Sequence, residues 1–573
     1  VAQIPARTVY RSPKGEWIVD FGQMLCGRVR IRVDAPKGAE LTFEYFEVTD
    51  RAGNYCNTMI APQRDVYISN GSPCRYEAAF TFHGFRYLRV SGADSVHKED
   101  FTAVALSTEK ENLGAFECSD PRLNRLYQNI RWSQRSNMLS IPTDCPSREK
   151  GGFTGDIQIY AKTAMLNEEM TPFLTGWLKN LKAAQAENGA VPITVPETAP
   201  YRRLMAANAR EFGDEPPVGV AGWSDAAVLV PYTMYRLTGN RRILEEQYES
   251  MTHWCGYIIR TAEGRRGDSG LPHEVDSVLW NTGFHFGEWL IPSEEKGITQ
   301  KEACQRSAFY TAPIFGYLSV KCMAEIAEVL QKPEKAYYSR TAGQMKAAIQ
   351  TALICDGELR SQNMGAYVLM IAFDLVPEHC KEHFAQKLIS LLDSHHGCLD
   401  TGFLATPFLL DAFVKIGRRD LAIKLLWQTR MPSWLYEVEQ GATSVWESWD
   451  AITPGSEPRI TSYNHYAFGC VDAWIFENIA GIRALEPGFR RVEIAPDPDG
   501  LPLEYCRRSF RCEYGELLVF WDRRTLRVSI PCGVRAVIRW QGASHEVGSG
   551  EYTFTEPHRG GDQNERTGQY PIL

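Results

Sequence analysis

The sequence lacks several features that would assign it to a simple class. It has no run of about 18 apolar residues, so no membrane-spanning helix is expected. Its net charge of −8 comes without a cluster of Lys and Arg, which argues against a nucleic-acid surface. The 15 cysteines are odd in number and scattered without a C-x-x-C pair, so neither a metal site nor a disulfide framework is expected. Reduced thiols favour a cytoplasmic location.

The chain also lacks an initiator Met and a signal peptide at Val1, so we expect an upstream segment to have been removed or left out. What is present is an ordinary globular composition, 44% hydrophobic and 23% charged, spread over 573 residues. That length exceeds what one hydrophobic core usually supports, so we expect several domains. Aromatic residues make up 11%, which suits either large cores or the apolar faces of sugars.

The first part of the chain alternates apolar and polar residues between turns. Val29, Ile31 and Val33 are separated by arginines, and similar segments follow up to about Ser107. Alternation of this kind is typical of half-buried strands. An N-terminal antiparallel β-sandwich over residues 1–110 is therefore predicted.

Helical spacing replaces the alternation after this point. Asp120 and Pro121 form a start signal for a helix, in a segment over 111–140 that we interpret as a helical linker. Helical patterns then dominate to about Leu485, with long loops at 188–222, 263–300 and 431–465. A closed (α/α)6 barrel over 141–485 would gather these loops at one mouth, although periodicity does not distinguish it from a helical solenoid.

Strand patterns return after Leu485 and predict a second β-sandwich over 486–573. The last stretch, 556–573, is polar, and we expect it on the surface or partly disordered.

One short segment, DCPSREKGGFTGD from Asp144 to Asp156, contains three carboxylates, two basic residues and three glycines. Each carboxylate alone suits a turn or a helix cap, but together they predict a functional loop. Helical spacing after Asp156, at Ile157, Tyr160 and Ala164, predicts an amphipathic helix that its carboxylate could cap while facing the site.

A second candidate segment is GATSVWESWD, from Gly441 to Asp450. Glu447 stands between Trp446 and Trp449, and an apolar setting of this kind would tune a carboxyl group for acid–base chemistry. A surface loop with two packing tryptophans is the equally good alternative. Two carboxylates brought to one mouth by separate loops are what glycoside hydrolysis requires.

The chain resembles the bacterial α-L-rhamnosidases of glycoside hydrolase family 78 in these two segments and in three further motifs, FHGFRYLRV from Phe82, NHYAFG from Asn464 and AGIRALEPGFRRVEIAPDP from Ala480. The resemblance covers nearly the whole chain in order. It implies an (α/α)6 barrel between β-sandwich domains and an inverting exo-hydrolase that removes terminal α-linked L-rhamnose from glycosides or polysaccharides.

The resemblance also implies roles for individual residues. Glu149 matches the general acid of the family and Glu447 its general base. Matches to sugar-binding residues are Asp144, Arg148, Phe153, Asp156, Trp223, Trp289 and His465. No cofactor and no metal are expected, and the partner is a rhamnose-containing glycoside or oligosaccharide. A calcium requirement and the oligomeric state are left open, with a homodimer as one expectation.

Two further expectations concern the loop itself. Asp144 and Asp156 are expected to be anionic and so to hold a proton on Glu149. Arg148 opposes that effect, or instead holds a sugar hydroxyl or a flanking Asp. Gly151, Gly152 and Phe153 depart from the family pattern of a bulkier residue, a glycine and Trp, so we expect a wider or softer floor to the sugar subsite.

Two alternative functions stay open at the level of sequence. One is a glycosidase with the same barrel but a different sugar in its subsite. The other is a carbohydrate-binding protein without catalytic activity.

Overall fold

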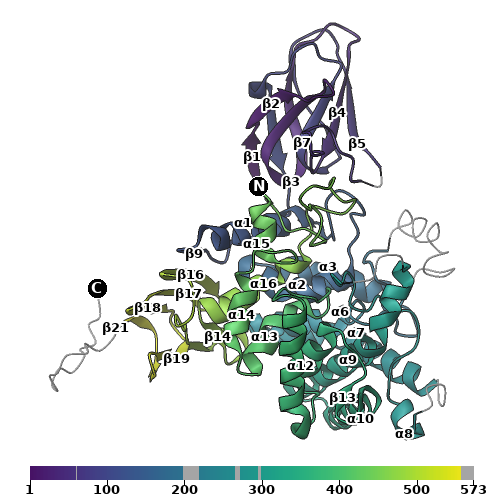
Figure 1. Cartoon of the computed structure of the whole chain (residues 1–573), viewed down its shortest axis with the longest axis vertical. Helices are drawn as coiled ribbons and strands as arrows, with labels where there is room; N and C mark the ends of the chain where they lie inside the picture. Colours follow the sequence, from purple (N-terminus) through teal and green to yellow (C-terminus); the bar gives the residue numbers. More distant parts are fainter. Residues whose placement is uncertain (60, 198–217, 265–270, 294–297, 556–573) are drawn as a thin grey trace.

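The computed structural model describes residues 1–59, 61–197, 218–264, 271–293 and 298–555, and shows an N-terminal β domain seated on a helical domain with a C-terminal β domain at its side (Figure 1). Parts of the long loops predicted at 188–222 and 263–300, and the predicted polar tail at 556–573, lie outside the described residues.

The N-terminal domain is built on one antiparallel sheet in the order β1-β8-β3-β7-β4-β5, with β2 and β6 also paired to β3. Its strands are β1 (Ala2–Pro5), β2 (Thr8–Arg11), β3 (Trp17–Val33), β4 (Glu40–Phe46), β5 (Gln63–Ile68), β6 (Cys74–Glu77), β7 (His83–Ser91) and β8 (Phe101–Ala105). The long strand β3 pairs with β2 and β7 nearer its start and with β6 and β8 nearer its end, so it joins both layers of the sandwich.

The alternation in β3 is confirmed. Val29 and Ile31 are buried in the sandwich core. Arg28 and Arg30, on the opposite face, both pair with Glu77 of the neighbouring strand. Alternate side chains of a strand point to opposite faces, so this pattern fixes which face is apolar.

The central domain is helical. Its helices are α1 (Pro121–Asn137), α2 (Thr154–Asn167), α3 (Thr171–Ala184), α6 (Ala226–Thr238), α7 (Arg241–Gly264), α8 (His273–Asp276), α9 (Gln300–Val329), α10 (Lys335–Leu353), α11 (Met364–Ala372), α12 (Lys381–Ser394), α13 (Thr406–Lys415), α14 (Arg419–Leu426), α15 (Trp434–Glu439) and α16 (Val471–Trp474), the last with a 3₁₀ turn before it (Ala467–Cys470) and a π turn after it (Ile475–Ile479). Two short hairpins accompany them, β10 (Met138–Leu139) with β11 (Ile141–Pro142) and β12 (Ile354–Cys355) with β13 (Glu358–Leu359). As predicted, Asp120 caps α1, accepting a hydrogen bond from the Arg122 N–H, with Pro121 in the first turn.

Among the described helices, six form a closed inner ring. Contacts run from α2 to α6, α9, α11, α13 and α16, and α16 packs back on α2. This closure confirms an (α/α)6 barrel and excludes an open solenoid, whose ends would not meet. The remaining helices lie outside the ring, as α7 and α10 do against α9.

The helix after the site loop differs from the prediction in one respect. All residues of α2 but Lys162 are buried, so the helix is not amphipathic. The reason is its place in the inner ring, with α6 on one side and α16 on the other. A helix that is covered on all sides needs no polar face.

The C-terminal domain has two sheets, in the orders β14-β15-β19-β20 and β21-β18-β17-β16-β9. The strands are β9 (Phe116–Cys118), β14 (Ile482–Ala484), β15 (Arg491–Ile494), β16 (Tyr505–Cys512), β17 (Gly515–Asp522), β18 (Thr525–Ile530), β19 (Arg535–Trp540), β20 (Ala543–Val547) and β21 (Gly550–Thr555). Two details differ from the prediction. The supposed linker supplies strand β9, and β15 pairs with β19 in parallel. Pairing between distant segments is not visible in local periodicity.

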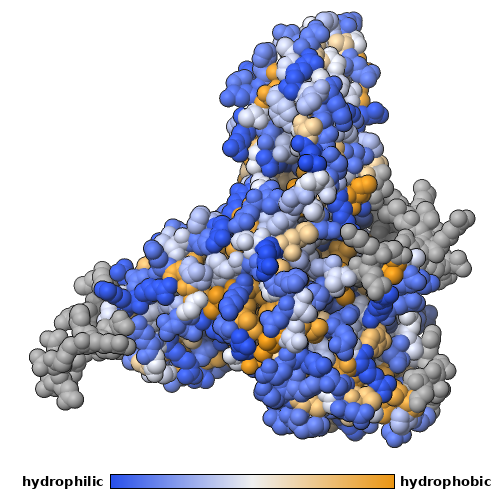
Figure 2. Space-filling view, in the orientation of Figure 1, coloured by the Kyte–Doolittle hydropathy of each residue, from blue (hydrophilic) through white to orange (hydrophobic). Residues whose placement is uncertain are grey.

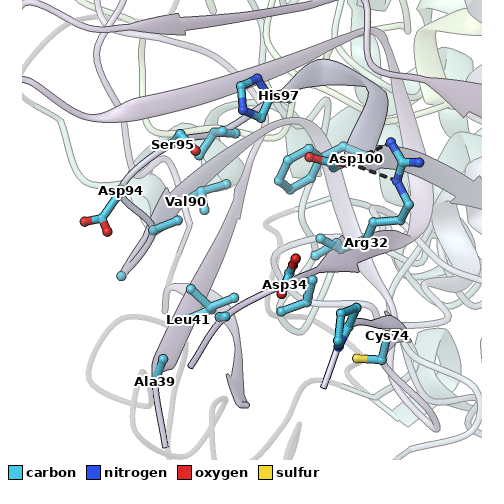
Figure 3. A pocket seen from close by; sticks show the side chains of 18 of the residues that line it. Arg32, Asp34, Ala39, Leu41, Cys74, Val90, Asp94, Ser95, His97 and Asp100 are labelled. Carbon is cyan, nitrogen blue, oxygen red and sulfur yellow. Dashed lines mark hydrogen bonds and ion pairs between the residues drawn. The ribbon is translucent and has the colours of Figure 1, made fainter. Parts of the chain in front are cut away.

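A cavity of about 860 Å³ opens in the N-terminal sandwich (Figure 3). Its wall includes the Arg32–Asp100 ion pair. Residues near the start of β4 line the cavity. The contact with the helical domain lies at the opposite end of β4, where Glu47 binds Ser147. Seven extended residues span roughly 20 Å, so the cavity is separate from the helical mouth.

The face of the molecule in Figure 2 is mainly hydrophilic, with hydrophobic residues gathered over α13 and α14 beside the C-terminal domain. Within the described residues, no helix is both long and apolar enough to cross a membrane.

Candidate active site

The candidate residues lie on segments that precede helices of the inner ring. The loop that holds Asp144 and Glu149 leads into α2, and the segment with Glu447 and His465 leads to α16. Trp223 comes just before α6, and Trp289 before α9. The candidates therefore stand at or near the N-terminal ends of α2, α6, α9 and α16, and the first turn of a helix favours negative charge.

Two backbone contacts hold the loop before α2. Asp144 and Gly151 are joined twice, since the Asp144 N–H donates to the Gly151 carbonyl and the Gly151 N–H donates to Asp144 Oδ1 at 2.8 Å. The Gly152 carbonyl accepts from the Val195 N–H at 2.8 Å. A Cβ on Gly152 would lie 2.2 Å from the Val195 carbonyl oxygen. Close backbone approach therefore requires this glycine, and hydrogen bonds hold the segment in place. The width of the sugar subsite stays a prediction.

Asp144 is not the anion that the sequence led us to expect. It is buried, and burial, followed by the charges of Glu149 and Asp156, raises its pKa well above the ordinary value. Glu149 is more exposed, at 24% of its side chain, and accepts a hydrogen bond from the Cys145 thiol at 3.2 Å. Burial therefore favours the protonated form of Asp144.

The Asp144, Cys145 and Glu149 side chains have potential ligand atoms within 4.8 Å of one another. Burial, with the charges of Asp144 and Glu149, raises the pKa of Cys145 well above its ordinary value. A thiol that keeps its proton is a poor metal ligand, since the thiolate is the form that binds. The donor set therefore fits proton sharing better than a metal ion.

Arg148 faces Glu149 rather than a flanking aspartate. Its Nη1 donates to the Thr58 carbonyl at 3.0 Å, and its Nε lies 3.7 Å from Glu149 Oε1. Within the described part of the chain, that buried Nε has no hydrogen-bond partner.

Glu447 is held by donors rather than by the two indoles. Its Oε2 accepts from the Thr461 hydroxyl at 3.1 Å and from the Ser462 N–H at 3.0 Å. Trp446 packs on Tyr463 and Trp449 stacks on Phe468, so the indoles belong to separate apolar clusters. Hydrogen bonds from Thr461 and Ser462 therefore hold the Glu447 carboxylate in place, whereas the two indoles pack mainly on other aromatic rings.

His465 and Asp156 form a buried pair. His465 Nε2 lies 3.0 Å from Asp156 Oδ1, and the Ala467 N–H donates to His465 Nδ1. The proton on the neutral ring is therefore at Nε2. Asp156 does not cap α2; it stands in the first turn with its carboxylate toward the histidine.

The aromatic candidates lie close together. The Trp223 ring packs against Gly155, where a Cβ would come within 2.6 Å of the indole. Phe286, which sequence reasoning missed, contacts both Trp223 and Trp289 with ring centroids 4.8 and 5.3 Å away. Phe153 packs against the main core at the start of α2.

His285, another histidine near these loops, serves the scaffold. It accepts the Ala221 N–H at Nδ1 and binds the Thr282 carbonyl through Nε2. Burial lowers its pKa to about 4, so the ring is neutral. It thus fixes the loop that carries Trp223.

Both candidate catalytic carboxylates influence the pKa values of Arg148 and His465. Burial lowers the pKa of Arg148, but Glu149, Glu447, Cys145 and Glu47 raise it, and the net shift is upward. Burial likewise lowers the pKa of His465, whereas Asp156, Glu447 and Glu149 raise it, again with an upward result. Glu149 and Glu447 therefore converge on one space.

Sequence reasoning missed Glu47 and Thr58 of the N-terminal domain. Glu47 accepts a hydrogen bond from Ser147, and the Thr58 carbonyl holds Arg148. A single carboxylate at the end of a strand gives no periodic signal that would reveal such a role.

Three family models match the chain in succession. Residues 10–107 match the bacterial alpha-L-rhamnosidase concanavalin-like domain, and residues 111–479 match the 6 hairpin glycosidase domain of the same enzymes. Residues 481–553 match the bacterial alpha-L-rhamnosidase C-terminal domain.

Individual proteins give the same result. An alpha-L-rhamnosidase of Streptomyces avermitilis is 33% identical over 96% of this chain and 53% of its own length, and one of Formosa agariphila is 32% identical over 91% and 54%. The crystal structure of the Streptomyces avermitilis alpha-L-rhamnosidase complexed with L-rhamnose has a TM-score of 0.87 at 32% identity, covering 97% of this chain and 53% of that one. The native alpha-L-rhamnosidase of Aspergillus terreus has a TM-score of 0.86 at 31% identity, covering 97% and 63%.

The chain spans about half the length of the curated relatives it matches. The 6 hairpin glycosidase model alone covers more than half of the chain, and the inner ring of helices agrees with it. The chain belongs to the bacterial alpha-L-rhamnosidase family.

Proposed function

We propose that the chain hydrolyses terminal α-linked L-rhamnose from glycosides or polysaccharides with inversion at the anomeric carbon. Glu149 gives its proton to the glycosidic oxygen as the bond from that oxygen to the anomeric carbon breaks. Glu447 takes a proton from a water molecule, whose oxygen bonds to the opposite face of the same carbon. The products are β-L-rhamnose and the free alcohol, and no cofactor takes part.

The observation that carries this proposal is that the loops of Glu149 and Glu447 meet at Glu47, which accepts hydrogen bonds from Ser147 in one loop and from the Tyr463 N–H in the other. An inverting enzyme needs two carboxyl groups on opposite sides of the sugar, roughly 6.5–9.5 Å apart, so that water fits between one of them and the substrate. The two loops come from distant parts of the chain, which suits that arrangement.

The hydrogen bonds around Glu149 and Glu447 support their roles as acid and base. Glu149 accepts a hydrogen bond from the Cys145 thiol, and the neighbouring Asp144 has a pKa that burial raises well above its ordinary value. Glu447 instead accepts two hydrogen bonds at Oε2, which hold its carboxylate in a fixed position, as a base that activates water requires.

The sugar subsite is assigned to the side chains around these two. The Asp156–His465 pair and the Arg148 guanidinium offer hydrogen bonds to hydroxyl groups. Trp223, Trp289 and Phe153 offer apolar surface to the ring of the sugar and its methyl group. The bound L-rhamnose of the Streptomyces avermitilis relative supports this sugar.

Proton NMR of the first product from an aryl α-L-rhamnoside tests the reaction. Early appearance of β-rhamnose, followed by slow mutarotation, is the expected result. First-formed α-rhamnose would contradict inversion. Turnover of a glucoside or glucuronide but not of the rhamnoside would indicate a different sugar, and sugar binding without turnover would indicate a carbohydrate-binding protein.

A further inference from the structure

The N-terminal sandwich reaches the candidate active site through two segments that follow β4. Glu47 comes directly after that strand, and Thr58 lies in the connection to β5. Both side chains are buried, at 4% and 0% exposure, although they belong to a domain that stands apart from the barrel in Figure 1. Buried groups of this kind must be paired, so their partners reveal their role.

One carboxyl group, that of Glu47, contacts both catalytic loops. Its Oε1 accepts from the Ser147 hydroxyl at 2.9 Å, two residues before Glu149. Its Oε2 accepts from the Tyr463 N–H at 3.3 Å, and the preceding residue, Ser462, donates its N–H to Glu447.

Thr58 completes the connection on the acid side. Its hydroxyl lies 3.5 Å from Glu47 Oε2, and its carbonyl accepts from Arg148 Nη1 at 3.0 Å. The guanidinium that faces Glu149 is therefore anchored on the N-terminal domain. The N-terminal domain also packs closely on the Glu149 loop at Gly84 of β7. A Cβ at that glycine would lie only 2.7 Å from the Pro146 side chain.

We propose that Glu47 is a positioning residue of the hydrolase, which sets the placement of the Glu149 loop relative to the Glu447 loop from a separate domain. The inference rests on the proposed roles of those two glutamates. An error of about 1 Å in such spacing can cost roughly 100-fold in rate, so a group that fixes it affects turnover more than binding.

The protonation state of Glu47 agrees with this role. Burial raises its pKa to about 8; hydrogen bonds from Ser147 and Tyr463 and the charge of Arg148 oppose the shift, and Glu447 adds to it. The group is thus protonated at neutral pH. The Ser147 hydroxyl and the Tyr463 N–H both donate to this carboxyl group, and in its protonated form it places no buried anion beside Glu447.

Two substitutions of Glu47 separate positioning from simple packing. Glu47→Ala removes both contacts and should lower kcat on an aryl α-L-rhamnoside at least tenfold with KM changed less than about threefold. Glu47→Gln keeps the volume, one donor and one acceptor, and should recover most of that loss. The matched control is Glu44→Gln in β4, whose carboxylate pairs with Arg89 on the sandwich and touches neither loop.

Amide hydrogen exchange gives a readout that does not depend on turnover. In Glu47→Ala, exchange should accelerate in both segments, 144–151 and 447–463, while Glu44→Gln leaves both as in the unmodified protein. Unchanged exchange in either segment, or equal kcat for Glu47→Ala and Glu44→Gln, would overturn the proposal. Faster exchange in a protein that hydrolyses no rhamnoside would uphold the positioning and refute the proposed function instead.

Discussion

At the scale of single residues, burial divides two neighbouring carboxyl groups into different roles. Asp144 is buried and keeps its proton, whereas Glu149 reaches solvent and lies beside the Arg148 guanidinium. Sequence order gives no indication of this division, because both residues sit in one polar loop. Only the fold shows which of them is desolvated.

The two proposed catalytic residues should respond differently to the leaving group. Glu149→Gln should lower kcat by roughly 10²–10⁴ on glycosides with poor leaving groups and less on activated aryl glycosides, which need little protonation. Glu447→Gln should suppress both substrates, since water must be activated in either case. Initial rates on a matched alkyl and nitrophenyl pair measure the difference. Losses below about tenfold in both variants would contradict acid–base roles.

Glu47 should also make the free energy of unfolding depend on pH. Its pKa is about 8 in the folded chain and near 4.5 when unfolded, so the folded state binds more protons between those values. Stability from this group is complete below about pH 4.5, falls as pH rises, and is lost above about 8. Between pH 6 and 9 the loss is on the order of 2–3 kcal/mol, at 1.36 kcal/mol per pH unit.

Denaturant unfolding of the unmodified protein and of Glu47→Gln at pH 6 and pH 9 measures this loss. The amide does not titrate, so the variant should lack the part of the alkaline decline that Glu47 causes. Parallel declines in the two proteins would show that Glu47 ionises as freely in the folded chain as in the unfolded one.

At the scale of elements, the contact between α2 and the Trp223 loop leaves no room for a side chain. Gly155→Ala would place a Cβ within 2.6 Å of the indole, so the ring must move. We expect a loss of about 1–3 kcal/mol in stability and a higher KM for the rhamnoside, because Trp223 borders the proposed subsite.

A glycine elsewhere provides the control for helix propensity. Gly176 is exposed in α3, and nothing lies within 4 Å of a Cβ built there. Gly176→Ala should therefore stabilise the chain by about 0.5–1 kcal/mol. Thermal unfolding of both variants checks the opposite signs. A Gly155→Ala variant more stable than the unmodified protein would show that the Trp223 loop can move to accept the Cβ without loss of stability.

The elements were predictable where a local rule decides them. The Asp120–Pro121 start of α1 follows from capping, and β3 follows from alternation. The full burial of α2 was not predictable, because it results from packing against α6 and α16, which come much later in the chain. The (α/α)6 barrel itself needed the family resemblance, since ring closure depends on α16 meeting α2 and leaves no local pattern.

The residues of the candidate site likewise fall into a predictable and an unpredictable group. Motif positions anticipated the two loops with Glu149 and Glu447, and in the structure both loops contact Glu47. Glu47, Thr58 and Phe286 had no local signal, because their roles come from domain contact. The anionic state expected for Asp144 was wrong because burial cannot be judged from charge spacing alone.

At the scale of the whole molecule, a buried ion pair joins the C-terminal sandwich to the barrel. Arg508 of β16 binds Asp472 of α16 at 3.1 Å, and both side chains are fully buried. Asn167, the last residue of α2, donates to the same aspartate at 2.9 Å. The pair therefore locks the last ring helix, the first ring helix and the C-terminal sheet together.

Removing one partner of this pair should destabilise the molecule strongly. Arg508→Ala leaves Asp472 as an unpaired buried charge, which typically costs about 3–5 kcal/mol. Arg539→Ala is the control, since Arg539 lies in the same domain, is 60% exposed and pairs with Glu493; its loss should stay below about 1 kcal/mol. Differential scanning calorimetry compares the stability of the two variants. The segment with Glu447 leads into α16, so the Arg508→Ala variant should lose activity at the temperature at which its barrel unfolds. Equal stability of the two variants would show that the C-terminal sandwich is held by its apolar contacts alone.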